Sequence, residues 1–176
     1  MASNVLISDQ MNAAINRQIG NELEASTQYL AIAAYFASED LLELVQHFYQ
    51  QSDEERAHAM RFLKFVLDAG GHVQIPTIPE PQNRFSSAEE AIQKALSGEV
   101  EVTQQINALV DIAVQEKDHI THNYLQWFMT EQLEEVSSMN TLLKIVQRAG
   151  ESNLLMVEEY LVRHGRLTAG TDTAEA

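Results

Sequence analysis

Six polar side chains of the sequence have the types and the spacing of a metal site that is built on helices. They are Glu22, Glu55, His58, Glu99, Gln132 and Glu135. These residues interrupt four otherwise apolar helical seams, and an offset of 77 residues maps the first three positions onto the last three. The sequence therefore predicts two copies of one helical hairpin. We expect all six groups to meet at one level in the interior of a helical bundle.

The chemistry expected of this layer follows from its charge. Four carboxylates that are buried together cannot all stay ionised, because each isolated charge costs several kcal/mol or takes up a proton. A pair of divalent or trivalent metal ions removes that cost, and an oxygen-rich site with one imidazole suits iron or manganese better than a metal that prefers soft ligands. A structural network that satisfies the same groups by hydrogen bonds is the alternative that the residues leave open.

Long helices must position these groups, and the sequence indicates where they begin and end. Residues 9–69 and 87–149 are rich in Ala, Leu, Glu and Gln, which favour helix. Each stretch is too long for one helix of a compact domain. We expect the first stretch to break near Asp40, where Asp40 and Glu43 have the spacing of a capping box. The second stretch is expected to break at Lys117-Asp118.

A linker separates the two hairpins. All three prolines lie within residues 70–86, and Ser86-x-x-Glu89 and Ser87-x-x-Glu90 then offer two overlapping capping boxes. At ~3.3 Å per residue this segment reaches ~55 Å, more than the ~40 Å length of a long helix. It can therefore cross the whole bundle and make the second and third helices parallel.

These features predict an all-α fold, a four-helix bundle with one long crossover between helices two and three. A short fifth helix is expected after Gly150, from Ser152 to about His164. We expect one domain over residues 1–165 and a flexible tail over residues 166–176.

Composition excludes several classes of function. The chain has 176 residues with 26 acidic and 11 basic side chains, a formal net charge of −15, and no cysteine. The charge opposes binding to nucleic acid or to an anionic membrane and favours cations. The absence of cysteine excludes thiol catalysis, thiolate zinc sites and cysteine-held iron–sulfur clusters. We see no secretory signal and no span for a membrane, and we expect a cytoplasmic protein.

Three stretches resemble the bacterial non-haem ferritins: NELEASTQYL (21–30), DEERAHAM (53–60) and LQWFMTEQLEE (125–135). The resemblance covers about residues 8–165. Di-iron bundles of this kind use one Glu from each of two helices and Glu-x-x-His from the other two. The first hairpin matches that pattern fully, whereas the second departs from it with Gln132-x-x-Glu135.

The resemblance implies a ferroxidase centre inside each subunit. The first iron is expected on Glu22, Glu55 and His58. The second iron is expected on Glu55 as a bridge, on Glu99 and on Glu135, with Gln132 beside it. A third and weaker iron site is expected on acids that face the cavity, namely Glu54, Glu131 and Glu134. Tyr29 matches the family tyrosine beside the centre, and the resemblance implies that it is a hydrogen-bond partner and a candidate electron donor. A tyrosine that only packs in the core is an equally good interpretation.

The function implied by the resemblance is iron storage by a ferroxidase. Fe(II) would be oxidised by dioxygen or peroxide, and Fe(III) would be kept as a ferric oxide mineral in a hollow cage of about 24 copies of the chain. No haem is expected, because Arg56 follows the bridging Glu where bacterioferritins have a haem-ligating methionine.

Other functions remain as alternatives. A di-iron oxidase of a small organic substrate would show an apolar substrate pocket beside the metal site. DNA-protecting mini-ferritins lack the short fifth helix and place their ligands between subunits, so they fit less well. Rubrerythrin-like peroxidases would need a second Glu-x-x-His and usually cysteines.

A second polar group lies at the expected start of the fourth helix. It consists of Asp118, His119 and His122. In ferritin cages this end of the bundle lies near subunit junctions where iron passes, so the resemblance suggests an iron route. Simple complementation of the helix dipole is the competing interpretation of Asp118.

Overall fold

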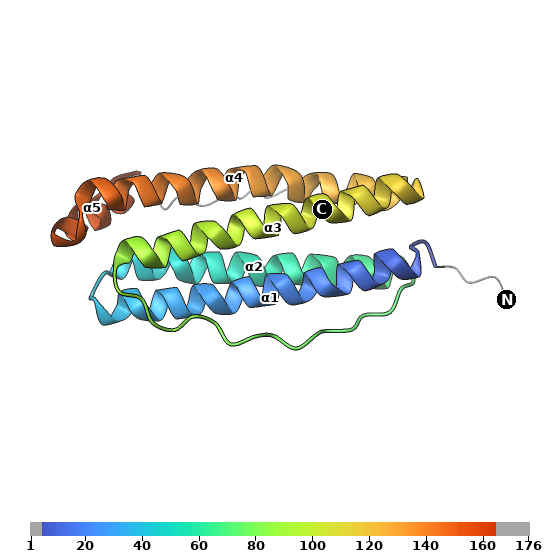
Figure 1. Cartoon of the computed structure of the whole chain (residues 1–176), viewed down its shortest axis with the longest axis horizontal. Coiled ribbons are helices and arrows are strands. Elements are labelled where there is room, and N and C mark those ends of the chain that lie inside the picture. Colours follow the sequence, from blue (N-terminus) through green and yellow to red (C-terminus); the bar gives the residue numbers. More distant parts are fainter. Residues whose placement is uncertain (1–4, 165–176) are drawn as a thin grey trace.

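The structure is a computed structural model that describes residues 5–164, and over this range every regular element is helical. The elements are α1 (Asp9–Ser38), α2 (Leu42–Asp68), α3 (Ala88–Glu116), α4 (His119–Ala149), a 3-10 turn (Glu151–Asn153) and α5 (Leu154–His164). Figure 1 shows two antiparallel hairpins, α1–α2 and α3–α4, and a long crossover that makes α2 and α3 parallel. The predicted all-α bundle with its crossover and short fifth helix is confirmed. The tail predicted for residues 166–176 lies outside the described range.

The turn between α1 and α2 differs from the prediction in its details. The break is where it was expected, but Asp40 does not cap α2: its backbone is left-handed, with φ 58°, and Leu41 holds the cap position without a side-chain hydrogen bond. The capping carboxylate comes from α5 instead. Glu158 accepts hydrogen bonds from the backbone N–H groups of Glu43 (2.8 Å) and Leu44 (2.9 Å). An acid from a distant helix therefore satisfies the free N–H groups at the start of α2.

The other helix boundaries follow their local signals. Ser87 caps α3 and accepts from the N–H of Glu90 (3.0 Å), as the capping boxes predicted. Lys117 ends α3 in a left-handed conformation, and the carboxylate of Asp118 caps α4 by accepting from the N–H of Thr121 (2.9 Å). The break predicted at Lys117-Asp118 is therefore confirmed.

The crossover is held against α1 by side-chain amides. Asn12 exchanges two hydrogen bonds with the backbone of His72, at 2.8 and 3.0 Å, and Gln28 does the same with the backbone of Gln82, at 2.9 and 3.0 Å. Between these points the crossover passes over Gly20, where a Cβ atom would lie 2.2 Å from the ring of Pro76. Glycine at this position allows the close approach.

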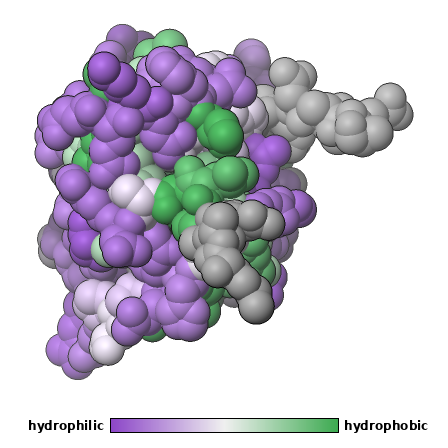
Figure 2. All heavy atoms as spheres, turned by 90° about the vertical axis from the view of Figure 1, so that its right-hand side faces the viewer, coloured by the Kyte–Doolittle hydropathy of each residue, from purple (hydrophilic) through white to green (hydrophobic). Residues whose placement is uncertain are grey.

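The end of the bundle at which α1 and α4 begin carries apolar side chains on its surface. Figure 2 shows this end, with hydrophobic side chains at its centre and hydrophilic ones around them. Three helices place an exposed apolar residue near their ends here: Leu67, Val114 and Ile120 are each more than half exposed. Grouped apolar surface is typical of a contact with another protein chain. Within the described residues, none of the helices has a stretch long and apolar enough to cross a bilayer.

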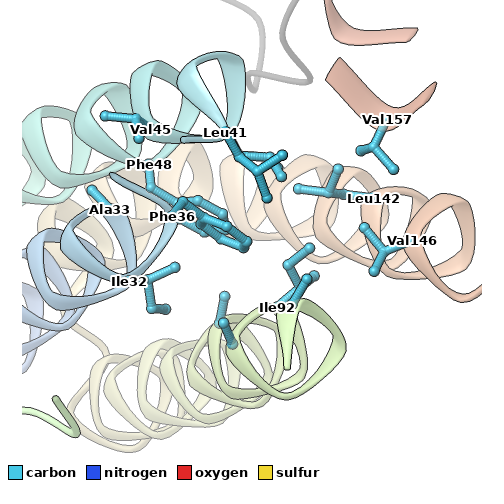
Figure 3. Close-up of a cluster of buried hydrophobic side chains, with 14 of the residues drawn as sticks. Ile32, Ala33, Phe36, Leu41, Val45, Phe48, Ile92, Leu142, Val146 and Val157 are labelled. Carbon is cyan, nitrogen blue, oxygen red and sulfur yellow. The ribbon is translucent and has the colours of Figure 1, made fainter. Parts of the chain in front are cut away.

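Two hydrophobic clusters fill the bundle, one on each side of the polar layer. The first lies toward α5 and is drawn in Figure 3, where Phe36 and Phe48 stack with ring centroids 5.4 Å apart. The second lies toward the start of α1, where Phe62 and Phe128 stack with centroids 4.1 Å apart. The polar layer is therefore enclosed by packed apolar side chains along the length of the bundle.

Candidate metal centre

Three side chains that could ligate a metal ion converge where α1 meets α2. Glu22, Glu55 and His58 each offer one ligand atom, and these three atoms lie within 4.8 Å of one another. All three residues are buried, and His58 Nδ1 lies 3.2 Å from Glu55 Oε2. Glu22 Oε2 is buried and has no hydrogen-bond partner. A structural hydrogen-bond network would give each of its buried oxygens a partner, so a buried oxygen without one fits a cation ligand better.

The second hairpin places its polar residues at the same level. Glu99 of α3 accepts hydrogen bonds at both oxygens: Gln132 Nε2 donates to Oε2 at 3.1 Å, and the hydroxyl of Tyr29 donates to Oε1. Glu135 is 1% exposed, and both of its carboxylate oxygens lack a hydrogen-bond partner. This half of the layer therefore contains one carboxylate that is held on both sides and one that is free to bind a cation.

Burial dominates the electrostatics of the layer. It raises the pKa of Glu22 and of Glu55 well above the ordinary value, and the neighbouring carboxylates raise both further. Burial also raises the pKa of Glu99 to about 7, although the hydrogen bond from Tyr29 opposes the shift. The pKa of Glu135 rises to about 9, through burial and then through the charge of Glu99. Without a cation, the layer keeps protons that ordinary glutamates would have lost at neutral pH.

A bound cation would reverse this situation, because positive charge favours the ionised form of each carboxylate. The donor set is four carboxylates and one imidazole, with an amide beside them, and it contains no sulfur. Hard oxygen ligands of this kind suit iron or manganese. The residues therefore fit a pair of such ions, and the three buried carboxylate oxygens without partners are the atoms that such a pair would use.

The acids expected to form a third site are close to the layer but are not gathered into a compact group. Glu54 is half-buried and accepts a hydrogen bond from Gln51 Nε2 at 2.6 Å. Burial raises its pKa, and the nearby charge of Glu131 adds to the shift. Glu131 is half-buried and Glu134 is exposed. In the described part of the chain, only Glu22, Glu55 and His58 form a group of three acids or histidines with ligand atoms within 4.8 Å.

The residues at the start of α4 lie in a different place. The carboxylate of Asp118 accepts a hydrogen bond from the backbone N–H of Thr121. His122 is half-buried, and His119 is exposed at the end of the bundle. None of them belongs to the polar layer at the middle of the helices. The iron route suggested for them stays a prediction.

Two residues near the layer were not identified from the sequence. Gln18 is buried, and its Nε2 donates to Glu22 Oε1 at 3.0 Å and to Gln105 Oε1 at 3.2 Å. Its position one helical turn before Glu22 is the signal that could have revealed it. Trp127 packs edge-on against His58 with centroids 5.5 Å apart, and the Arg61 guanidinium lies 3.7 Å from the centroid of its ring. Gln18 and Trp127 therefore contact two of the candidate ligands, Glu22 and His58.

Comparisons with known proteins agree with this geometry. A family model described as a ferritin-like domain matches residues 12–149. The chain is 40% identical over 174 residues to "Ferritin BfrB" of Mycolicibacterium smegmatis, covering 99% of this chain and 96% of the relative. It is 36% identical over 155 residues to "Bacterial non-heme ferritin" of Staphylococcus aureus, covering 88% of this chain and 93% of the relative. Among solved structures, an open pore ferritin from Archaeoglobus fulgidus matches with a TM-score of 0.86 and 37% identity, over 89% of this chain and 96% of that chain.

Proposed function

This chain belongs to the ferritin family, and we propose that it oxidises Fe(II) at its internal carboxylate layer and stores the Fe(III) as a mineral inside a cage of its own copies. The observation that carries the proposal is the buried layer of Glu22, Glu55, His58, Glu99 and Glu135, in which three carboxylate oxygens have no hydrogen-bond partner. Iron is the substrate of this layer.

Each residue of the layer has a proposed part in binding the substrate. Glu22, Glu55 and His58 hold one Fe(II), because they form the compact group of ligand atoms. Glu55 also faces the second half of the layer, where Glu99 is the leading charge acting on it, so it is the natural bridge. Glu99 and Glu135 hold the second Fe(II). Binding of both ions displaces the protons that the metal-free carboxylates retain.

The layer favours the oxidised product. Carboxylate oxygens are hard anionic ligands, and they bind Fe(III) more strongly than Fe(II), which makes loss of an electron easier. Two Fe(II) ions each give up one electron, and the pair of electrons reduces dioxygen to peroxide or peroxide to water. Tyr29 keeps Glu99 in position by its hydrogen bond during this exchange.

The two halves of the layer are proposed to hold iron with different strength. The first half offers two carboxylates and an imidazole, whereas in the second half Gln132 occupies the repeat position of Glu55. An amide is neutral and is a weaker iron ligand than a carboxylate. Iron should therefore leave the second half more readily, which suits a protein that passes Fe(III) onward to a store. Glu54, Glu131 and Glu134 are the acids that would receive it on the way.

Storage requires enclosure, because a single bundle cannot keep ferric oxide in solution. The exposed apolar residues at the end of the bundle, among them Leu67, Val114 and Ile120, support contacts between copies. By family resemblance we propose a closed cage of about 24 copies. The net charge of −15 favours accumulation of iron cations around and within such a cage.

The test is aerobic addition of Fe(II) to the native protein, followed by sedimentation analysis with detection of both protein and iron. We expect a large hollow particle before loading, and afterwards a denser particle that carries the ferric mineral with it. A stable monomer or dimer, or ferric oxide that precipitates as fast as in buffer alone, would contradict the proposal.

A further inference from the structure

A pocket of about 70 Å³ opens between α1 and α3 and reaches the carboxylate layer from the side. Two of its lining residues are almost completely buried, namely Glu99 of the layer and Tyr29, which donates a hydrogen bond to it. The other lining residues include three exposed charged side chains at its mouth, Glu24, Lys94 and Glu101. The pocket therefore runs from the surface of the bundle to the Tyr29–Glu99 hydrogen bond.

One position in the wall of the pocket has no side chain. That position is Gly98, directly before Glu99, and a Cβ atom built there would have no heavy atom within 4 Å. Gly20 on α1 is the contrast, since a Cβ atom there would collide with Pro76. Gly98 is thus not required by close packing, and its backbone is ordinary helix within α3. The absence of a side chain at Gly98 leaves open space beside the buried carboxylate of Glu99.

We propose that this pocket, the α1–α3 port, admits a partly dehydrated Fe(II) ion to the Glu99 side of the layer. The inference rests on the proposed function, and it adds a route that starts at the α1–α3 face, apart from the residues at the start of α4. The port is defined by Glu24, Tyr29, Lys94, Gly98, Glu99 and Glu101.

The charges and sizes favour a cation. The mouth has two carboxylates against one ammonium, and the base ends at the carboxylate of Glu99. Dioxygen and hydrogen peroxide carry no net charge, so the negative charge at the mouth would not steer them. The pocket is large enough for a cation that keeps part of its hydration shell. Side-chain oxygens along the port can replace the water that the ion loses on the way to Glu99.

The wall of the port is also connected to the first half of the layer. Gln105 lines the port, donates to Glu101 at 3.4 Å and accepts from Gln18 at 3.2 Å. Gln18 in turn donates to Glu22. Hydrogen bonds thus hold the wall in a fixed position relative to the ligands, which favours a built passage over an accidental gap between helices.

The experiment follows the rate of metal binding in the intact, native assembly without oxygen. The probe is Co(II), whose visible absorbance reports ligation, mixed with the protein in a stopped-flow instrument. Gly98→Leu places a side chain in the open space, and Ser97→Leu adds the same side chain at the neighbouring exposed position as the matched control. We expect Gly98→Leu to bind Co(II) more slowly than the parent and to reach the same final amount. Gly98→Ala should lie between them, and Ser97→Leu should match the parent.

The charge of the mouth is tested separately. The double variant Glu24→Gln, Glu101→Gln should lower the rate of Co(II) binding by about tenfold at low salt, with little difference at high salt, because steering by charge is screened. Equal rates for Gly98→Leu and Ser97→Leu would overturn the port. So would a Gly98→Leu variant that slows only oxidation by dioxygen and binds Co(II) normally, since the pocket would then serve the oxidant. If the parent binds no Co(II) in its interior and oxidises Fe(II) no faster than Glu55→Ala, the proposed function itself fails.

Discussion

Gln132 donates a hydrogen bond of 3.1 Å to Glu99. The amide that breaks the symmetry of the two hairpins is therefore bonded to the first polar residue of the second hairpin, which we propose as an iron ligand. The internal repeat places Glu55 at the corresponding position of the first hairpin. A carboxylate could form this bond only in its protonated state, whereas an amide forms it at every pH. The layer can therefore keep Glu99 in place without a metal ion.

Gln132→Glu should bind the second metal ion about tenfold more tightly, because it adds a carboxylate where the parent has a neutral amide. A more persistent pair of ions and slower repeated turnover should follow. The measurement is metal occupancy of each half of the layer in crystals soaked with Fe(II), together with oxidation rates over successive additions. A variant that holds the second ion no more tightly and turns over as fast as the parent would refute this account of the asymmetry.

Glu55→Ala should do far more damage than Glu131→Ala. A residue that only orients a metal ligand costs roughly 10- to 100-fold in affinity or activity when it is lost. We therefore expect loss of the proposed bridge to slow the fast phase of Fe(II) oxidation by at least about 100-fold. Glu131 is half-buried beside the layer, and its loss should change only the stoichiometry or the recovery between additions. Stopped-flow absorbance separates the two, and equal effects would contradict the assignment of Glu55.

The metal-free protein should lose stability as the pH rises from about 4.5 to about 9. The pKa of Glu135 is raised from 4.5 to about 9 and that of Glu99 from 4.5 to about 7, so in this range the folded chain binds more protons than the unfolded chain. Each extra proton makes the free energy of unfolding fall by about 1.4 kcal/mol per pH unit. Thermal unfolding at a fixed scan rate across this range measures the slope.

Glu135→Gln supplies the control for this pH dependence. An amide cannot ionise, so the variant should show a shallower slope and should be more stable than the metal-free parent at pH 9, by the part of the slope that Glu135 contributes. Saturation with Co(II) should flatten the slope of the parent, since the ion replaces the protons. A metal-free parent whose stability rises between pH 5 and 9 would show that the carboxylates are not buried together as described.

Gly20→Ala should destabilise the chain by about 1–3 kcal/mol, because the added methyl group would lie 2.2 Å from the ring of Pro76 and push the crossover away from α1. Gly98→Ala is the matched control: nothing stands in the way of its methyl group, and alanine favours helix by about 0.5–1 kcal/mol over glycine. Thermal unfolding of the two variants should therefore shift in opposite directions. A shift in the same direction would mean that the crossover does not rest on Gly20.

Glu158→Ala should cost about 1 kcal/mol, since it removes the carboxylate that accepts from the N–H groups of Glu43 and Leu44 at the start of α2. Glu159→Ala removes only an exposed ion pair with Arg163 and should change stability by less than about 0.5 kcal/mol. Hydrogen exchange at Glu43 and Leu44 reports the cap directly. Unchanged protection of these two amides in Glu158→Ala would rule out the capping role.

Much of the fold and of the candidate site could be predicted from the sequence, because the signals are local or periodic. The apolar seams and the offset of 77 residues predict that Glu22, Glu55 and Glu99 lie at one level of a bundle. Ser87 and Asp118 cap their helices by bonds to the next turn. Side chains three or four residues apart lie on the same face of a helix, so their relations are fixed by the helix itself.

Only the tertiary structure decided the contacts between distant segments. Asp40 has the spacing of a capping residue, yet it adopts a left-handed turn, which aspartate tolerates, and Glu158 caps α2 from 115 residues away. Likewise, the bond from Gln18 to Gln105 joins residues 87 apart, and the open space beside Gly98 depends on how α1 and α3 pack. Sequence periodicity states which face of a helix is buried, but it does not state which partner meets that face or at what distance. Those distances are set by the packing of whole helices, which no single segment of the chain encodes.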